Sequence, residues 1–328
     1  MKPRRPDLGG TVFVAAMVIL GVAVGVVILR HRVATPQAGA PHHLLENPYQ
    51  AQPFHRGQLH VQSSRAIGHG LPRDVAHAYQ RLGYEWMAIT DINTLTPTDQ
   101  FAVAGTSPVR GTEAAFPFGH LLDYAVDEIP QAASLQQNID FVRGQAGLAV
   151  LAHPNVAPAV TAEQALALRN LDAVEIFDAR VAREQPSLAE ATQTWDRLLS
   201  AGRRTWGVVG DDSIELDGPM STIGLTSVDV QAPGLSEALV LQAVRSGAFV
   251  ASAGVRILGV DTSSGDTIRV ITTNANSIRW YGRGGSLLAT TQGSAGTYRV
   301  HWDETYVRAV ADGADGARAW SQPVFVVP

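Results

Sequence analysis

The sequence predicts a mixed α/β fold, in which a parallel sheet or barrel is followed by a small β-sandwich and preceded by a membrane-spanning helix. Apolar strands alternate with capped helices from Arg56 to about Ala253, which is the pattern of a parallel α/β sheet or barrel. From about Val255 the chain changes to short β-rich runs separated by glycine-containing turns, as in a β-sandwich. Near the amino terminus, Thr11 to Leu29 form a run of 19 uncharged, almost wholly apolar residues.

The apolar run at 11–29 is long enough to cross a bilayer core of about 30 Å at about 1.5 Å per helical residue. A cleaved signal peptide is the alternative, but its apolar region is shorter, about 7 to 15 residues. We therefore expect an uncleaved, single-pass membrane anchor within residues 1–32. Three basic side chains precede the run and two follow it, so the positive-inside rule places the body outside the cytoplasm.

Composition and length predict one large and one small globular domain. The chain has 328 residues, of which 45% are hydrophobic and 17% charged. We expect a linker at 33–55, a barrel at 56–254 and a β-sandwich at 255–328. Because five of the 25 basic residues but only one of the 30 acidic residues lie in 1–40, the body is acidic, which argues against a nucleic-acid partner. The absence of cysteine excludes disulfides and thiolate metal ligands.

Residue patterns place the expected elements along the chain. Pro72 and Gly83 suit the start and stop of a helix, and capping-box patterns at Ser134, Thr161 and Ser187 predict three more helix starts. The expected strands of the larger domain are 58–62, 86–90, 109–113, 121–126, 148–152, 173–177 and 206–210. Those of the smaller domain are 267–272, 277–281, 297–302, 306–311 and 324–327.

Histidine and carboxylate side chains occur at the ends of successive predicted strands. They are His60, Glu113, His120, His153 and Asp212, and Gln62 leaves its strand on the same side as His60. In a parallel barrel, side chains at the carboxyl ends of the strands converge on one site. Imidazole nitrogens and carboxylate oxygens are ligands for Zn, Mn or Fe. A single buried histidine is more often structural, but five such residues at successive strand ends favour a shared metal site.

The order of these motifs resembles the PHP (polymerase and histidinol phosphatase) metallohydrolases, in particular their CehA/McbA-type branch. The resemblance covers residues 56–328. Its motifs are His60-Val61-Gln62-Ser63, His69-Gly70, Thr90-Asp91-Ile92, Gly111-Thr112-Glu113, Gly119-His120-Leu121-Leu122, Ala152-His153-Pro154 and Gly210-Asp211-Asp212-Ser213-Ile214. The family resemblance implies a distorted (βα)7, TIM-like PHP barrel followed by the small carboxyl-terminal β-sandwich.

The resemblance also implies up to three metal sites. The first would use His60, Gln62 where the family has histidine, Glu113 and Asp212, and the second would use Glu113, His120 and His153. The third would need His69, Ile92 and Ile214, and two aliphatic residues cannot coordinate an ion. We therefore expect one or two divalent ions, Zn or Mn with Fe as a further candidate. The amide oxygen of Gln62 is a poorer ligand than imidazole for Zn-type ions.

These observations predict a membrane-anchored, metal-dependent hydrolase that uses a metal-activated water, with a small phosphoester as its substrate. Asp91 is expected to orient a ligand histidine, and Asp211 or His69 to protonate the leaving group. Asp178 is expected either to line the pocket or to cap the next helix. Two alternatives stay open: a degenerate, non-catalytic PHP domain that binds a ligand or partner, and a hydrolase of carbamates or carboxylic esters.

Overall fold

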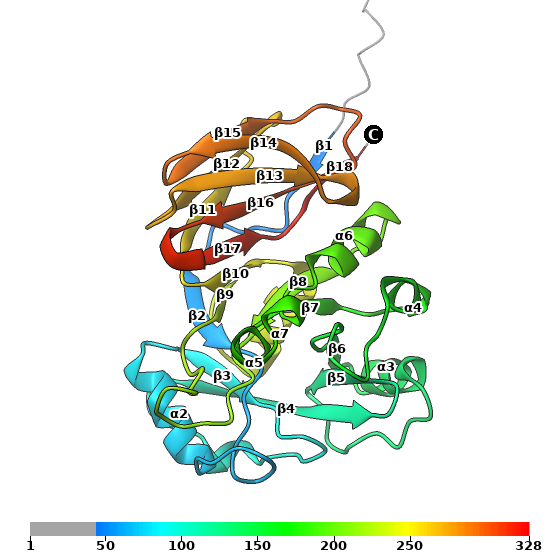
Figure 1. The fold of residues 1–328 in the computed structure, drawn as a ribbon, viewed down its shortest axis with the longest axis vertical. Coiled ribbons are helices and arrows are strands. Elements are labelled where there is room, and N and C mark those ends of the chain that lie inside the picture. The colour runs from blue at the N-terminus through cyan, green and yellow to red at the C-terminus, as the bar shows by residue number, and fades with distance from the viewer. Residues whose placement is uncertain (1–43, 328) are drawn as a thin grey trace, which may run out of the picture. The chain divides into compact units, whose positions relative to one another are not determined.

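The computed structural model describes residues 44–327, which form six helices and eighteen strands (Figure 1). The strands are β1 (Leu44–Glu46), β2 (Phe54–Gln58), β3 (Trp86–Ile89), β4 (Ser107–Phe116), β5 (Gly119–Tyr124), β6 (Leu148–Leu151), β7 (Ala173–Asp178), β8 (Trp206–Gly210), β9 (Ser227–Gln231), β10 (Phe249–Ala253), β11 (Ile257–Asp261), β12 (Thr267–Thr272), β13 (Ser277–Gly282), β14 (Ser286–Gln292), β15 (Ala295–Arg299), β16 (Tyr306–Asp312), β17 (Arg318–Ser321) and β18 (Val324–Val327). The helices are α2 (Pro72–Arg81), α3 (Leu135–Gly144), α4 (Ala162–Ala167), α5 (Ala179–Glu184), α6 (Thr192–Ser200) and α7 (Glu237–Ser246). The predicted mixed α/β class is confirmed.

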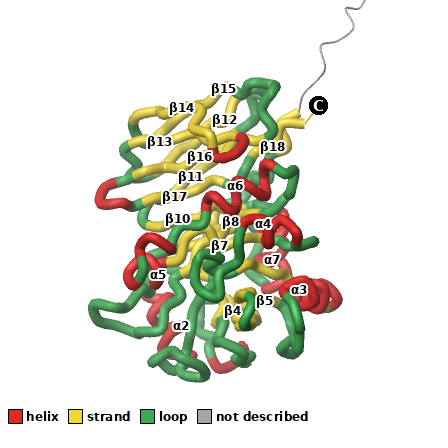
Figure 2. The backbone as a smooth tube through the Cα atoms, turned by 45° about the vertical axis from the view of Figure 1, so that its right-hand side comes forward, coloured by secondary structure: helices red, strands yellow, loops and turns green. Residues whose placement is uncertain are grey.

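One large sheet connects the earlier and later strands of the described chain. Its main path runs β1-β18-β16-β17-β10-β9-β2-β3-β4-β5-β6-β7-β8, and β13 and β14 branch from β16. A separate sheet of three strands has the order β11-β12-β15. Buried side chains of both sheets, among them Ile268, Val270, Ile278 and Trp280, form one apolar cluster. Figure 2 shows these carboxyl-terminal strands gathered together, with α2 and α3 lying outside their group.

The seven strands from β2 to β8 bring their ends together around the site. Neighbours along this path are parallel, except that β5 is antiparallel to both β4 and β6. Backbone hydrogen bonds of 3.0 Å from Asp212 to His60 and from Gln62 to Ser213 join the segments that follow β2 and β8. The first and last strands of the path therefore meet at their carboxyl ends.

The prediction of uniformly parallel strands is wrong for β5. β4 and β5 form a hairpin in which Phe116 pairs with Gly119. Gly119 has a φ of +132°, and a Cβ there would lie 2.5 Å from the Val160 side chain, so this turn requires glycine. The hairpin places the start of β5, rather than its end, beside the end of β4.

The first strand of the path ends earlier than predicted, at Gln58 rather than at Gln62. The Gln58 side-chain Oε1 accepts hydrogen bonds from the backbone N–H groups of Leu59 and His60, at 2.8 and 3.2 Å. These two N–H groups therefore cannot donate to a neighbouring strand, and β2 ends before them. Residues 59–62 continue as buried but irregular chain, with one parallel bridge between Val61 and Ser213.

Most of the predicted helix ends agree with the structure. α2 begins at Pro72, and Gly83 follows it with a φ of +78°. Ser134 caps α3 and Thr161 forms a complete capping box on α4. The predicted start at Ser187 is wrong, because α6 begins at Thr192. The chain before it is tied to β7 by a 2.9 Å hydrogen bond from the Ala191 N–H to the Ile176 carbonyl and by a bridge between Glu190 and Phe177.

The predicted membrane anchor lies outside the described residues, as does the first portion of the predicted linker. Within 44–327, no helix combines the length and the apolar character needed to cross a bilayer. Residues 44–46, in the middle of the predicted linker, form β1 and pair antiparallel with β18, and the last two residues of the predicted linker begin β2.

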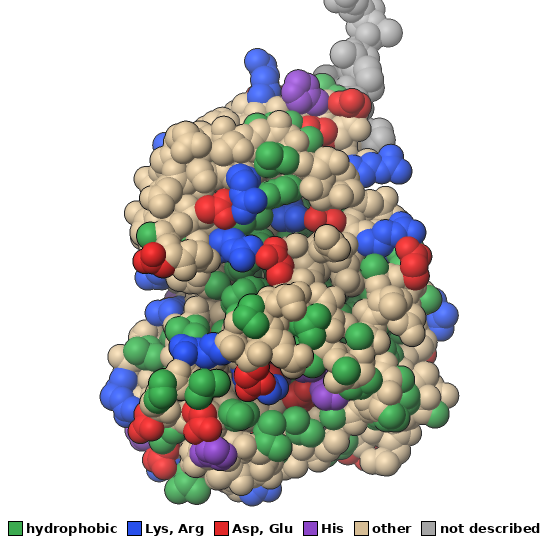
Figure 3. Space-filling view, viewed as in Figure 1, with side chains coloured by type: hydrophobic (Ala, Val, Ile, Leu, Met, Phe, Trp, Pro, Cys, Tyr) green, Lys and Arg blue, Asp and Glu red, His purple; other side chains and the backbone are tan. Residues whose placement is uncertain are grey.

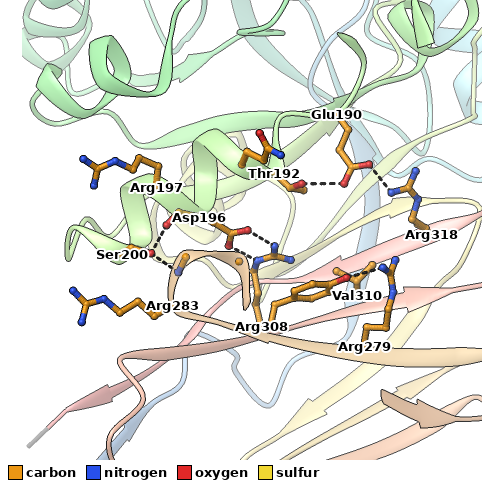
Figure 4. Close-up of a pocket in the computed structure, with 14 residues that line it drawn as sticks. Glu190, Thr192, Asp196, Arg197, Ser200, Arg279, Arg283, Arg308, Val310 and Arg318 are labelled. Atoms are coloured by element: carbon orange, nitrogen blue, oxygen red, sulfur yellow. Dashed lines mark hydrogen bonds and ion pairs between the residues drawn. The ribbon is translucent and has the colours of Figure 1, made fainter. Parts of the chain in front are cut away.

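A buried ion pair fastens α6 to the carboxyl-terminal strands (Figure 4). Arg308 donates through Nε and Nη2 to the Asp196 carboxylate at 2.8 and 2.7 Å. The Tyr306 hydroxyl donates to the same carboxylate at 2.9 Å. The pair borders a cavity of about 820 Å³. Arg279 and Arg318 on its wall are paired with Asp312 and Glu190. Most of the cavity's charged groups are therefore balanced within the protein.

Replacement of Asp196 by alanine should lower the free energy of unfolding by about 3–5 kcal/mol, because it leaves the buried Arg308 cation unpaired. The combined change Asp196→Leu and Arg308→Met should cost much less, since no buried charge is then left without a partner. As a control, Glu163→Ala removes the exposed pair with Arg197 and should cost under about 1 kcal/mol. Urea unfolding measures all three. A double variant as unstable as Asp196→Ala would contradict this account.

Asp123 should make the protein less stable as the pH rises from about 4 to 8. Burial raises the pKa of Asp123 to about 8, although Asn138 donates to both of its oxygens at 2.8 Å. The folded state then holds a proton that the unfolded chain has released, so stability falls by up to about 1.4 kcal/mol per pH unit across this window. Asp123→Asn should remove that component of the slope in urea unfolding measured at several pH values. Asp140→Asn, an exposed change on α3, should keep the slope, and an unchanged slope in Asp123→Asn would refute the assignment.

Candidate metal centre

The Glu113 carboxylate lies at the centre of the predicted ligands. Its Oε1 is 2.7 Å from His120 Nδ1 and 3.1 Å from His153 Nε2. Its Oε2 is 2.7 Å from Gln62 Nε2 and 3.3 Å from His60 Nε2. One buried carboxylate therefore contacts four side chains that the sequence predicts as ligands.

The strand ends explain why residues distant in sequence meet here. Glu113 lies on β4, and the antiparallel β5 brings His120, near its start, to the same edge of the sheet. His60, His153 and Asp212 lie just beyond β2, β6 and β8. His153 and Asp212 have φ values of +21° and +42°. Positive φ values are uncommon for residues other than glycine, and they are concentrated at functional sites.

Three overlapping groups of side chains have the geometry of a cation site among the described residues, and two of them consist of predicted ligands alone. Ligand atoms of Glu113, His120 and His153 lie within 4.8 Å of one another, as do those of His60, His153 and Asp212. The first group contains three nitrogen or oxygen ligands, as catalytic zinc sites do. The His120 side chain is 20% exposed, so this group can be reached from solvent. Figure 3 shows acidic, basic and histidine side chains reaching the surface together beside α5.

In the second group, one carboxylate oxygen has no hydrogen-bond donor. Asp212 Oδ1 is buried without such a partner among the described residues and lies 3.3 Å from His60 Nε2. A buried anionic oxygen in that state is a candidate for a cation. Both groups therefore fit a divalent ion by donor chemistry, and they share His153.

The charges of the cluster are strongly coupled. Burial disfavours the imidazolium of His60, but Asp212, Glu175 and Glu113 outweigh it and hold its pKa well above the usual value. Burial likewise opposes a charged His153, yet Glu113 raises its pKa to about 9. Burial would raise the pKa of Glu113, but hydrogen bonds from His120, His153 and His60 hold it well below its usual value. The cluster therefore holds protons where an ion would bind, and binding must release them.

Glu175 supports two of the histidines, and the sequence analysis gave it no role. Its Oε1 lies 3.0 Å from His60 Nδ1, and its Oε2 accepts the His153 backbone N–H at 2.8 Å. A carboxylate behind a ligand histidine fixes its ring orientation and raises its basicity. The one available sequence signal is a charged residue inside the otherwise apolar run 173–177.

Gln62 faces Glu113 through its amide nitrogen. The Ile92 backbone N–H can only donate, and it lies 3.1 Å from Gln62 Oε1. This contact fixes the orientation of the amide, so Nε2 donates to Glu113 Oε2. The oxygen predicted as a metal ligand is turned away from the cluster. In this arrangement Gln62 is a hydrogen-bond donor to the central carboxylate.

Arg180 is a second functional side chain that the sequence analysis missed. It lies in the first turn of α5, which follows β7 directly and so begins at the edge of the sheet where the site lies. Its Nε donates to Asp212 Oδ2 at 2.8 Å, and its Nη2 contacts the same oxygen. Burial alone would lower its pKa, but Asp212 raises the pKa above the usual value. Arg180 therefore carries a permanent charge beside the cluster.

The three residues predicted for orientation or acid catalysis have other partners in the described structure. Asp91 accepts hydrogen bonds from Ser63 and Thr96. Asp211 is fully buried, accepts from Tyr79, Gly224 and Thr226, and has a pKa raised by burial to about 6. His69 is exposed and pairs with Glu215 at 2.9 Å. In this structure these three residues brace loops around the site.

Asp178 acts as a helix cap, one of its two predicted roles. Its Oδ1 accepts the Val181 N–H at 2.8 Å at the start of α5. Its Oδ2 is buried without a hydrogen-bond partner among the described residues. Burial, together with the charges of Asp212 and Glu175, raises its pKa well above the usual value. Asp178 also forms a third group with His60 and Glu175, whose ligand atoms lie within 4.8 Å of one another.

Comparison with known proteins found similarity only among solved structures, since no family model and no curated protein match the sequence. One similar structure is a two-domain protein from Bacteroides vulgatus described as containing a predicted PHP-like metal-dependent phosphoesterase. It shares 11% identity, with a TM-score of 0.47 over 88% of this chain and 91% of that one. Another is a putative metal-dependent phosphoesterase from Bifidobacterium adolescentis, with 16% identity and a TM-score of 0.42 over 61% of this chain and 98% of that one.

A third similar structure is the lesion-specific endonuclease EndoQ from Pyrococcus furiosus. Its identity is 11% and its TM-score 0.45, over 58% of this chain and 56% of that one. At TM-scores below 0.5, these likenesses carry no information about substrate or mechanism. What this chain does must therefore be inferred from its own site.

Glu175→Gln should weaken metal binding by about 10- to 100-fold, because the amide no longer gives both His60 and His153 an anionic partner. The measurement is a zinc titration in competition with a chromophoric chelator. Glu163→Gln, an exposed change on α4, should leave the affinity unchanged. Equal affinities for wild type and Glu175→Gln would show that Glu175 does not help to hold the ligands.

Proposed function

We propose that this protein is a metal-dependent hydrolase of small phosphoesters. The observation that carries the proposal is the group Glu113, His120 and His153, in which three ligand side chains from three strand ends converge and one is open to solvent. Zn or Mn suits this mixed nitrogen and oxygen set. When bound, such an ion lowers the pKa of water and polarises a phosphoryl oxygen.

The protein's own residues would hold this centre in a fixed geometry. Glu113 is buried and has its pKa held low, so it remains an anion across the physiological range. Glu175 orients His60 through its ring nitrogen and His153 through its backbone. The partly exposed Arg180 adds a positive charge beside Asp212. A divalent ion bound at this centre, with the Arg180 guanidinium nearby, would favour an anionic phosphoester over a neutral carbamate or carboxylic ester.

The proposed hydrolase has a PHP-type barrel and an amino-terminal membrane anchor. A distorted seven-stranded, TIM-like PHP barrel is supported by the joined ends of the path from β2 to β8. Assignment to the CehA/McbA-type branch rests on the order of the sequence motifs. The membrane anchor at 11–29 and an extracytoplasmic body remain predictions from the sequence.

A non-catalytic domain that binds a ligand or partner is the second candidate. It is favoured by the amide nitrogen of Gln62 on Glu113, and by Asp91, Asp211 and His69 all having structural partners away from the cluster. A panel of phosphomonoesters, phosphodiesters, carbamates and carboxylic esters, assayed with Zn and with Mn, separates the candidates. Metal binding without turnover of any of them would favour the binding domain.

His153→Ala should remove tight metal binding and, with it, phosphoester hydrolysis, because at most two protein ligands would remain in the first group. Metal per chain by elemental analysis and hydrolysis are measured on the same preparations. The matched control is His301→Ala, an exposed histidine remote in sequence from the cluster. Full metal content in His153→Ala, or no bound metal in the wild type after reconstitution with Zn and with Mn, would overturn the proposed function.

A further inference from the structure

The group His60, His153 and Asp212 defines a second cation position next to the first. It shares His153 with the first group, and His60 Nε2 lies 3.3 Å from both Glu113 Oε2 and Asp212 Oδ1. The positive charge of a cation at this position would be balanced by those two carboxylates. Whether a second ion binds therefore depends on what else neutralises Glu113 and Asp212.

Arg180 already neutralises Asp212. Its guanidinium donates through both Nε and Nη2 to Oδ2, and Nε also lies 3.2 Å from the Asp212 backbone carbonyl. Asp212 is completely buried, and the Arg180 side chain is only 25% exposed. Solvent therefore screens this pair poorly, and a divalent ion nearby would be repelled by a guanidinium that cannot lose its proton.

Gln62 occupies the other carboxylate with a hydrogen bond, although it carries no charge. Its Nε2 donates to Glu113 Oε2 at 2.7 Å, the oxygen that faces His60. The Ile92 N–H holds the amide in this orientation. Among residues 44–327, the partners of Glu113 Oε1 are His120 and His153. Arg180 and Gln62 thus both disfavour a cation at the second position, and neither contacts the oxygen of Glu113 that faces the first position.

We propose that Arg180 takes the place of a second metal ion, so that the protein binds one ion per chain at Glu113, His120 and His153. The proposal rests on the proposed metal centre. Within the described part of the chain, Arg180 Nη1 has one long ion pair, 3.4 Å to Glu184 Oε2. The centre then combines one exchangeable ion with one permanent positive charge.

The test is metal stoichiometry of the full chain, measured with Mn by elemental analysis and by electron paramagnetic resonance, which detects the coupling of two ions that share a carboxylate. The wild type should bind one ion, with an uncoupled signal. Arg180→Met combined with Gln62→His should bind two, with a coupled signal, because it frees Asp212 Oδ2 and adds an imidazole. Arg183→Met with Gln62→His is the matched control. It removes a cation from the same helix without touching Asp212 and should bind one ion.

Each result separates this inference from the proposed function. No ion in the wild type would overturn the proposed function itself. Two coupled ions in the wild type would leave that function standing and overturn the role of Arg180, as would a folded Arg180→Met, Gln62→His variant that binds one. Asp212→Asn provides a test that does not require the Arg180 variant to fold. It should still bind one ion, and its loss would show that Asp212 is a ligand of the occupied position.

Discussion

The Glu113 carboxylate is the constraint on which the site depends. It is a buried anion whose two oxygens face two sets of partners: His120 and His153 on one side, Gln62 and His60 on the other. Burial of an unpaired carboxylate would be costly, so the surrounding imidazoles and amide are needed for the folded state as well as for any chemistry. Glu175 is a second buried carboxylate that is paired with imidazole. The His60 ring lies between the two carboxylates, with Nε2 facing Glu113 and Nδ1 facing Glu175.

Alternating strands and helices were sufficient to predict the mixed α/β class, and strand-end positions were sufficient to identify most of the side chains that meet. Each of those inferences uses local information. The direction of β5 does not follow from its apolar run, but it does follow from the connection: the seven residues between the predicted strands 109–113 and 121–126 are too few for a parallel crossover. The start of α6 could not be obtained from local sequence, because the tertiary contact of Ala191 with β7 overrides a local capping pattern.

The residues that the sequence analysis missed act through partners that lie far away along the chain. Arg180 and Asp212 are 32 positions apart, and Glu175 and His60 are 115 apart. The amide of Gln62 was predicted as a ligand because its place in the motif matches a histidine. Its orientation is decided by the Ile92 N–H, which no motif records. Sequence reasoning thus identified which side chains gather here, whereas the structure is needed to see which atoms face one another.

The hairpin between β4 and β5 gives the site an uneven sensitivity to changes in chain length. Glu113 and His120 are seven positions apart in one ladder, with Ala115 opposite His120, whereas the other strands that supply ligands to the cluster are joined through longer connections. Those connections can gain or lose residues at little cost. A single residue inserted into the turn at Pro117 and Phe118 would shift the register by one and carry His120 to the opposite face of the sheet. Lineages derived from this chain should therefore vary in loop length almost anywhere except at this turn.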